Sequence, residues 1–342
     1  MSLSKTLVLS LLFLLLLHLI VLLAGFVAPY DAATQFRDHP FAPPTRIHFF
    51  DSSGGYHLRP FVYLRKNNGE FAEYEEDNTR AAPLHFLVSG DPYSVLQVFH
   101  PSLHLFGVDQ PAHVFLFGSD DYGRDQFSRF LFGGQISLFS GLLAAGLSLG
   151  LGLLLGSAAG YHGGLLDAAL MRTTEVFAAL PWLYLLLALR AFLPLHMSPA
   201  QTFLLLITVI GVLGWSRPAR LVRGIVLSSK ERNYVGAARG FGATEWYLLR
   251  RHVLPQTRGV ILTQAAILIP QFILAEVTLS FLGLGVAEPV PSWGNMLSAL
   301  QQYSVLASYW WMIIPGFLLI PVFLGYYFLA QSLELRVESP PY

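Results

Sequence analysis

The chain has no cysteine and few charged residues. The lack of cysteine excludes disulfides, thiolate metal sites and cysteine nucleophiles, and it leaves the redox compartment open. Charged residues make up 12% of the 342 residues and apolar residues 54%, whereas soluble domains carry about 25% charged residues. The 21 basic and 21 acidic residues balance, so bulk charge indicates no nucleic-acid partner. This composition is typical of a membrane protein.

A nucleotide-binding motif is absent as well. The sequence has no G-x-x-x-x-G-K-[ST] phosphate loop, so we do not expect the chain to bind ATP in the usual way. We expect no cofactor and no metal in this chain. Any process that ATP drives would therefore need a second polypeptide.

Long apolar segments are the dominant feature that is present. A spanning helix needs about 20 mostly apolar residues, and six segments qualify, of which the fourth is the weakest: 7–27, 136–160, 169–193, 202–215, 260–284 and 310–329. The alternative for the first segment is a signal peptide that starts at Lys5, but its apolar run is long and no clean A-x-A site follows. We therefore expect a retained anchor at 1–28 and an all-α polytopic membrane protein with six transmembrane helices.

Basic residues are concentrated in one loop, 217–258, and this sets the expected orientation. The loop holds nine of them: Arg217, Arg220, Arg223, Lys230, Arg232, Arg239, Arg250, Arg251 and Arg258. The segments 194–201 and 285–309 hold none. Cytoplasmic loops carry an excess of Lys and Arg, so we expect this loop, both termini and a tail at 331–342 in the cytoplasm.

The segment 29–117 then lies outside, as a small, mostly β extracytoplasmic insertion between the first two spans. Residues 56–65 and 84–89 are strand-like, and turn signals stand at 52–55 and 67–69. A proline between His100 and His104 argues against one smooth helix that would pair them on a metal. Dispersed or packed histidines are favoured over a metal site for the seven of this segment: His39, His48, His57, His85, His100, His104 and His113.

Within the basic loop, residues 234–255 read YVGAARGFGATEWYLLRRHVLP. Ala237 and Ala238 are followed four residues later by Gly242, and such small residues leave room for close packing. We expect Gly242 to end a first helix and Pro255 to end a second one near the membrane. This pattern is typical of a membrane channel subunit that presents a short helix to a soluble motor.

Residues 117–138, FGSDDYGRDQFSRFLFGGQISL, come just before the second apolar segment. Ser119 is a candidate N-cap with Asp120 and Asp121 in the first turn of a helix. We expect 118–135 to form a short amphipathic lead-in that lies on the membrane with one apolar face: Phe127, Phe130 and Leu131.

Three motifs carry a family resemblance. Residues 234–255 resemble the EAA loop of bacterial ABC importer permeases, and 117–138 resemble the GTDxxGRD segment before the second helix of oligopeptide and dipeptide permeases. A third match is LSFLGLGVAEPVPSWGNML at 279–297. In this order they resemble the dipeptide/oligopeptide/nickel permease family, on the side of its C-type subunit. Two features depart from the family: Gly236 replaces the usual glutamate of the EAA motif, and the insertion is long.

The resemblance implies the type I importer permease fold in a bacterial inner membrane, with a permease core at 136–330 and no catalytic residue. It implies a homologous permease, two ATP-binding subunits or domains and an extracytoplasmic solute-binding protein as partners, beside membrane lipid. The implied solute is a peptide, with nickel or another small solute as the alternative. The ATPase-coupling residues would be Tyr234, Gly236, Ala237, Ala238, Gly242, Ala243, Leu254 and Pro255.

A few residues within the apolar segments stand out. Small residues at every fourth position of the second segment favour close helix packing over a pore wall: Ala144, Ser148, Gly152, Gly156 and Gly160. Pro270 and Gln271 are candidates for lining a pathway, because broken membrane helices sometimes do so. Glu276 is a candidate because it is ionisable within a span, although its place about 25 Å along the helix favours a structural hydrogen bond.

The alternative from another class is a membrane-anchored enzyme or sensor in which the outer segment is the functional domain. The sequence shows no catalytic constellation that favours this alternative. We therefore predict a permease subunit of an ATP-driven, binding-protein-dependent importer.

Overall fold

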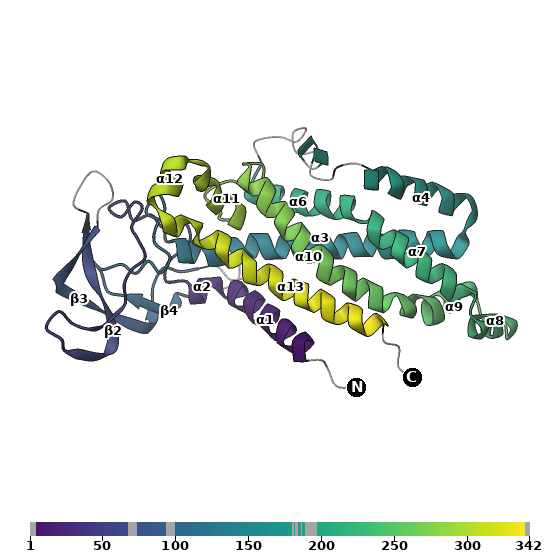
Figure 1. Ribbon diagram of the computed structural model, residues 1–342, viewed down its shortest axis with the longest axis horizontal. Helices are drawn as coiled ribbons and strands as arrows, with labels where there is room; N and C mark the ends of the chain where they lie inside the picture. The colour runs from purple at the N-terminus through teal and green to yellow at the C-terminus, as the bar shows by residue number, and fades with distance from the viewer. Residues whose placement is uncertain are drawn as a thin grey trace. The chain divides into compact units, whose positions relative to one another are not determined.

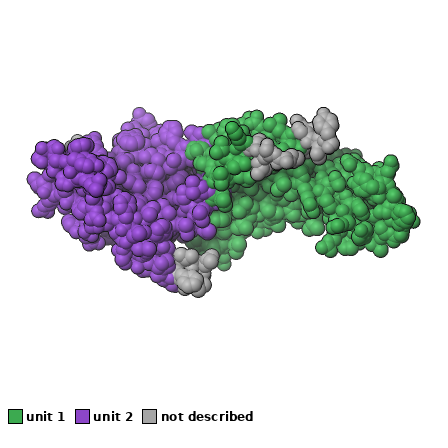
Figure 2. Space-filling view, turned by 90° about the horizontal axis from the view of Figure 1, so that it is seen from below, with its two compact units in different colours: residues 1–15, 138–279, 321–342 green, residues 16–137, 280–320 purple. Residues whose placement is uncertain are grey.

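The structure is a computed structural model of the chain, and it describes residues 5–67, 74–93, 100–179, 181, 184–185, 187–188 and 197–338. The chain divides into two compact units, which Figure 2 shows in different colours. Unit 1 comprises residues 1–15, 138–279 and 321–342, and unit 2 comprises residues 16–137 and 280–320.

Unit 2 contains a four-stranded antiparallel sheet (Figure 1). Its strands neighbour one another in chain order: β1 His48–Phe50, β2 Tyr56–Asn67, β3 Tyr74–Ser89 and β4 Leu103–Val108. Residues 56–65 and 84–89, which the sequence predicts as strands, lie within β2 and β3. Side chains alternate between the faces of a strand, and one face of β2, β3 and β4 contributes Val62, Leu84 and Phe106 to a buried core.

Unit 2 also contains short helices that follow the third family motif. They are α11 Trp293–Ser298, η3 Ala299–Gln301, α12 Tyr303–Ser308 and η4 Trp310–Ile313. Ser292 and Asn295 form a reciprocal capping box at the start of α11. The wholly buried Trp293 stacks on Phe130 and donates its indole N–H to the carbonyl of that residue at 3.0 Å. This bond joins the two family motifs at 117–138 and 279–297.

The start of the long helix α3, Gln126–His162, differs from the sequence-based expectation. Asp125, and not Ser119, lies at the N-cap position and accepts a hydrogen bond from the Ser128 N–H at 2.8 Å. Asp120 belongs to a preceding turn, which Gly123 closes with a φ of +72°. The expectation of a separate amphipathic helix at 118–135 is also wrong, because the helical residues of this segment, from Gln126 on, form the first part of α3.

Unit 1 is helical in its described residues. Beside parts of α1 Lys5–Leu22 and of α3, it contains α4 Gly164–Ala179, α6 Pro199–Gly214, α7 Ser216–Lys230, α8 Asn233–Gly240, α9 Glu245–Leu248, the π-turn η1 Leu249–Val253, the 3₁₀-turn η2 Leu254–Thr257 and most of α10 Arg258–Phe281. The last helix is α13 Ile314–Glu338, of which residues 321–338 belong to this unit.

The small-residue stripe of α3 packs against α7. A Cβ atom added to Gly152 would meet Pro218, and one added to Gly156 would meet the Ala219 backbone. One added to Gly160 would meet the Arg223 carbonyl oxygen and the Val226 side chain. The prediction that these small residues serve helix packing is confirmed for Gly152, Gly156 and Gly160, because only a residue without a side chain lets the two backbones come this close.

Four described helices are long and apolar enough to cross a membrane: Lys5–Leu22, Gln126–His162, Glu245–Phe281 and Trp310–Arg336. A fifth span results if α6 and α7, which are bent by 43° at their junction, count as one. The described residues thus show four or five spans, and the six that the sequence predicts are not confirmed. Much of the predicted third span, 169–193, lies outside the described residues.

The helix expected to end at Pro255 does not end there. From Glu245 to Phe281 the chain passes from α9 through η1 and η2 into α10 without leaving helical conformation. Pro255 is the second residue of η2, close to the start of that turn, where a missing N–H leaves few hydrogen bonds unmade.

Candidate functional site

Two short helices and a glycine turn form the tip of the basic loop in unit 1. α8 ends at Gly240, and Gly242 follows with a φ of +84°, a conformation that residues with a side chain rarely adopt. The amide of Phe241 donates to the carbonyl of Ala237 at 3.1 Å. The Thr244 side chain then caps α9 by accepting from the Tyr247 N–H at 3.3 Å. The prediction that Gly242 ends the first helix is confirmed.

One side of this tip is fixed to the rest of unit 1. Val235 of α8, Leu248 of α9 and Val253 of η1 are fully buried. Val253 packs with Val222 and Val226 of α7. Each turn of the tip therefore has an apolar anchor, which holds α8 and α9 against the helix before them.

The other side of the tip exposes aromatic rings. Phe241 is 92% exposed, and Trp246 and Tyr247 are more than half exposed. A shallow depression of about 540 Å³ lies beside them, lined by Ala238, Phe241, Gly242, Ala243, Thr244, Tyr247 and His252. Clustered exposed apolar residues mark surfaces that bind other proteins. We call this surface, Ala238 to Tyr247 with His252, the coupling surface.

Polar contacts hold the helices of the coupling surface in place. The Arg239 guanidinium lies 3.1 Å from the Glu245 carboxylate and so links α8 to α9. The Tyr161 hydroxyl donates to the same carboxylate. The Lys230 ammonium donates to the Gly160 carbonyl at 3.0 Å. These contacts join both helices of the tip, and the end of α7, to the last turn of α3.

The structure places only some of the predicted coupling residues in the depression. Ala238, Gly242 and Ala243 line it, whereas Tyr234, Gly236 and Ala237 are exposed on α8. Leu254 and Pro255 lie apart in η2 and are half-buried. Sequence reasoning did not single out the residues that complete the lining: Phe241, Thr244, Tyr247 and His252. A sequence signal exists for two of them, because the aromatic residues Phe241 and Tyr247 stand close to Gly242 in the chain.

The three pathway candidates do not converge. Gln271 lines a cavity of about 580 Å³ within unit 1, together with Arg217, Phe177 and Phe272 among others. Pro270 is half-buried inside α10. Glu276 is fully buried and is not among the described residues that line this cavity. The geometry therefore separates Gln271 from Glu276.

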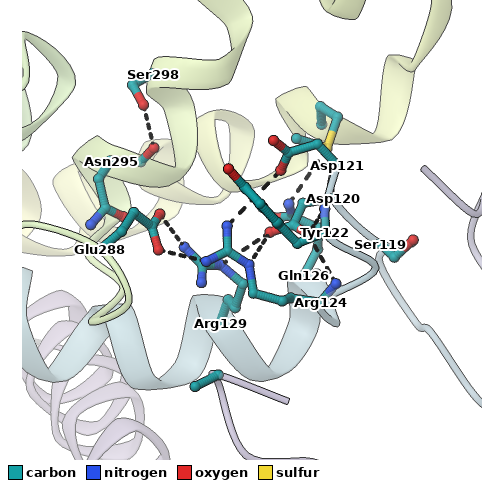
Figure 3. Close-up of polar contacts among 12 residues, drawn as sticks. Ser119, Asp120, Asp121, Tyr122, Arg124, Gln126, Arg129, Glu288, Asn295 and Ser298 are labelled. Carbon is teal, nitrogen blue, oxygen red and sulfur yellow. Dashed lines mark hydrogen bonds and ion pairs between the residues drawn. The ribbon is translucent and has the colours of Figure 1, made fainter. Parts of the chain in front are cut away.

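A second polar site, in unit 2, consists of two arginines between two carboxylates (Figure 3). The Arg124 guanidinium lies 2.7 Å from Asp120 and 2.6 Å from Glu288. The Arg129 guanidinium lies 2.7 Å from the other oxygen of Glu288 and 3.6 Å from Asp120. We call these four residues the charged junction. They join the turn before α3 to the chain that follows α10.

The charged junction is buried except for Glu288. Side-chain exposure is 1% for Arg129, 4% for Asp120 and 7% for Arg124, but 46% for Glu288. Asp120 also accepts the backbone N–H groups of Tyr122 and Arg124, at 2.9 Å each. No local sequence pattern indicates this site, because residues more than 150 positions apart supply its charges. Its geometry indicates a structural tie with no reacting group.

One sequence pattern of hydrolases does occur, GLSLG at 146–150, which fits G-x-S-x-G. In hydrolases that serine lies on a sharp turn between a strand and a helix. Here Ser148 lies within α3, fully buried at a close approach to Gly214 of α6. The pattern therefore serves helix packing and supplies no nucleophile.

Comparison with known proteins identifies the family. The family model described as "Binding-protein-dependent transport system inner membrane component" matches residues 152–339, which is more than half of the chain. The chain belongs to this family. The match covers α7 to α10 with the whole coupling surface, and it leaves the sheet of unit 2 outside. The chain is thus a multi-pass membrane subunit of a transport system.

Individual relatives agree with this assignment. The chain is 37% identical to the dipeptide transport system permease protein DppC of Bacillus subtilis (strain 168) over 225 residues, which are 66% of this chain and 68% of the relative. It is 36% identical to the oligopeptide transport system permease protein OppC of the same organism, over 66% of this chain and 72% of the relative. A chain of the MetNI methionine ABC transporter aligns with a TM-score of 0.44 at 18% identity, over 60% of this chain and 94% of that chain, a likeness too weak to bear on the assignment.

Proposed function

We propose that the chain is the permease subunit of an ATP-driven, binding-protein-dependent importer of peptides. The relatives named above are dipeptide and oligopeptide permeases, and they support a peptide as the solute. The observation that carries the proposal is the coupling surface, where exposed aromatic rings stand on helices anchored by Val235, Leu248 and Val253. A subunit that receives force from another protein needs a contact surface of this kind on a rigid base.

The proposed partners follow from what the chain lacks. Without a phosphate loop it takes energy from two ATP-binding subunits or domains. A homologous permease completes the pathway, and a solute-binding protein delivers the peptide outside. In this arrangement the basic loop faces the cytoplasm, the chain crosses the membrane six times with both termini inside, and residues 29–117 lie outside.

The proposed mechanism is a rigid-body transfer of motion. When the ATP-binding subunits close on ATP, they move α8 and α9 as one piece, because Arg239 and Glu245 link the two helices. η1, η2 and α10 continue α9 without a break, so the same motion reaches Gln271 in its cavity. The pathway then switches from inward-facing to outward-facing.

Substitution of Gly242 tests the proposal. Gly242→Asp places a side chain and a charge in the turn of the coupling surface, at a φ of +84° with open space around it. We expect uptake of a labelled dipeptide into proteoliposomes and co-purification of the ATP-binding subunits to be lost, while membrane insertion is retained. Gly54→Asp is the matched control, because Gly54 has a φ of +86° and equally open surroundings but lies between β1 and β2.

Each outcome of this experiment is informative. Normal uptake and co-purification in Gly242→Asp would contradict a role of the turn in coupling. Equal loss in Gly54→Asp would show that the strain of substituting a left-handed glycine, and not its place, causes the defect. If the unmodified transporter co-purifies with the ATP-binding subunits but takes up no peptide, the result contradicts only the proposed solute class.

A further inference from the structure

One cavity of unit 1 is lined by polar side chains that have no partner. It is the cavity of about 580 Å³ that Gln271 of α10 lines, and Ser216 and Arg217 of α7 line it as well. Arg217 and Gln271 are exposed. None of these three side chains forms a hydrogen bond or an ion pair with the described residues. Each of them is therefore available to a ligand in the cavity.

Much of the remaining wall of this cavity is apolar. Leu213 of α6 and Leu268 and Phe272 of α10 belong to it, and the last two are buried. Small-molecule sites have volumes of about 300–1,000 Å³ and combine an apolar lining with a few polar groups that orient the ligand. The size and the lining of this cavity both fit that description.

Arg217 lies where a candidate span bends. α6 has 16 residues, fewer than the about 20 that a spanning helix needs, so this span continues into the first turn of α7. The two helices are bent by 43° at their junction. Pro218 explains the bend, because its nitrogen carries no hydrogen for the carbonyl of Gly214, four residues earlier. Gly214 lines the same cavity.

An unpaired cation at the end of a span needs an anionic partner. Charged side chains within membrane segments are costly, and they pair with one another or mark substrate pathways. Arg223, six residues further along α7, is paired, because its guanidinium lies 2.5 Å from the carboxylate of Asp167. Arg217 has no such partner among the described residues and lines the cavity instead. The cavity is thus equipped for an anionic group.

We propose that this cavity binds the carboxyl-terminal end of the transported peptide, and that Arg217 pairs with the peptide carboxylate. The proposal rests on the proposed function, since it takes the solute to be a peptide. A guanidinium binds a carboxylate through two parallel hydrogen bonds. The Gln271 amide can both donate and accept, so it suits a peptide group, and Leu268 and Phe272 suit an apolar side chain. A free carboxylate is common to linear peptides, so this contact accepts peptides of different sequence.

Photoaffinity labelling tests the carboxylate contact. The two permeases and their ATP-binding subunits are assembled in nanodiscs without the solute-binding protein, so that its own preference for peptides plays no part. The probe is alanyl-photoleucine, a dipeptide whose second side chain carries a diazirine, and its adducts are mapped by mass spectrometry. The competitors are alanyl-leucine and alanyl-leucine amide, which differ only in the carboxylate.

We expect adducts on residues that line the cavity. Alanyl-leucine should suppress them at a concentration about tenfold lower than the amide, because only the carboxylate forms hydrogen bonds between charged groups. Arg217→Gln should reduce the adducts and remove the difference between the competitors, and Arg217→Lys should keep part of it. Arg220→Gln is the matched control, because Arg220 is exposed on α7 and has no ion pair with the described residues, but it does not line the cavity.

Equal competition by the two dipeptides, or adducts that Arg217→Gln reduces no more than Arg220→Gln does, would overturn the proposal. If the partner permease dissociates from Arg217→Gln but not from Arg217→Lys, Arg217 pairs with a carboxylate of that permease, and the proposal is likewise overturned. Uptake of labelled alanyl-leucine by the unmodified transporter is measured in parallel. Uptake without adducts in the cavity contradicts this site alone, whereas the absence of uptake contradicts the peptide as the solute and this proposal with it.

Discussion

The coupling surface and the charged junction are built in opposite ways, because the first exposes aromatic side chains and the second buries charged ones. The coupling surface displays Phe241 to solvent at 92% exposure and uses one exposed ion pair, Arg239 with Glu245. The charged junction buries Arg129 at 1% exposure and gives it two carboxylate neighbours. The first is built from glycine, alanine and exposed rings, and the second from two buried arginines between a buried carboxylate and a half-exposed one.

Under the proposed function, this difference separates a surface that contacts a partner from a site that supports the fold. An exposed ion pair contributes about 0–1 kcal/mol to stability, so the coupling surface depends on its buried valines and leucine to keep its shape. A buried charge that loses its partner destabilises a protein by about 3–5 kcal/mol. Substitutions in the charged junction should therefore change folding, and substitutions of exposed coupling residues should change function alone.

The largest effect is expected in the charged junction. Asp120→Ala removes the carboxylate that forms ion pairs with two arginines and accepts two backbone N–H groups. We expect the free energy of unfolding to fall by about 3–5 kcal/mol, measured by thermal or denaturant unfolding in detergent. Asp121→Asn is the control, because Asp121 is half-exposed and 4.0 Å from Arg124. A change of similar size in the two variants would contradict the distinction between buried and exposed charge.

The second-largest expected effect distinguishes the buried side of the tip from its exposed side. Leu248 is fully buried beneath the coupling surface, so Leu248→Ala should lower the free energy of unfolding by about 2–5 kcal/mol. Phe241→Ala should change it by less than about 0.5 kcal/mol and yet reduce ATP-driven uptake. Stability is read from unfolding in detergent and uptake from proteoliposomes. If uptake falls in proportion to the loss of stability in both variants, Leu248 and Phe241 do not have separate roles as buried anchor and exposed contact.

A smaller effect concerns a half-buried titratable group, His113, without a buried counter-charge. His113 packs among Tyr30, Phe36, His39 and Phe115 in unit 2. Burial, and next the charge of His39, lower the pKa of His113 from 6.5 to about 4. The folded state thus favours the neutral ring. Its contribution to stability is complete above pH 6.5 and is lost as the pH falls from 6.5 towards 4.

The measurement for His113 is the pH dependence of unfolding. Between pH 7 and pH 5 the unmodified chain should lose about 1–2 kcal/mol through this group. His113→Phe keeps an aromatic ring in the cluster and removes the titration, so its stability should fall less over the same interval. Identical pH profiles of the two proteins would show that His113 does not titrate in this way.

The elements that a local pattern specifies were predicted from the sequence. Gly242 ends α8 because a left-handed residue after a helix needs glycine. The stripe of Gly152, Gly156 and Gly160 predicted a helix contact, because small residues four apart share one face of a helix. The family resemblance rested on three such local motifs, and the match at 152–339 confirms the family.

Features that depend on distant residues were not predicted. Glu288 reaches Arg124 and Arg129 across about half of the chain, and no spacing in the sequence signals this contact. The N-cap of α3 was assigned to Ser119, because its serine and acidic sequence is a common cap pattern. The positive φ of Gly123 turns the chain first and moves the cap to Asp125. The local sequence offers several candidates for the N-cap of α3, and the contacts of the folded chain select Asp125.

Cysteine cross-linking at the coupling surface tests the central claim most directly. Phe241→Cys and Tyr303→Cys each give this chain one thiol, at residues that are 92% and 82% exposed, on the coupling surface and on α12 respectively. In the assembled transporter, a short bifunctional reagent should join position 241 to an ATP-binding subunit, identified by mass spectrometry, and leave position 303 unjoined to that subunit. A transporter that hydrolyses ATP but yields no cross-link at position 241, or an equal one at position 303, would contradict the account.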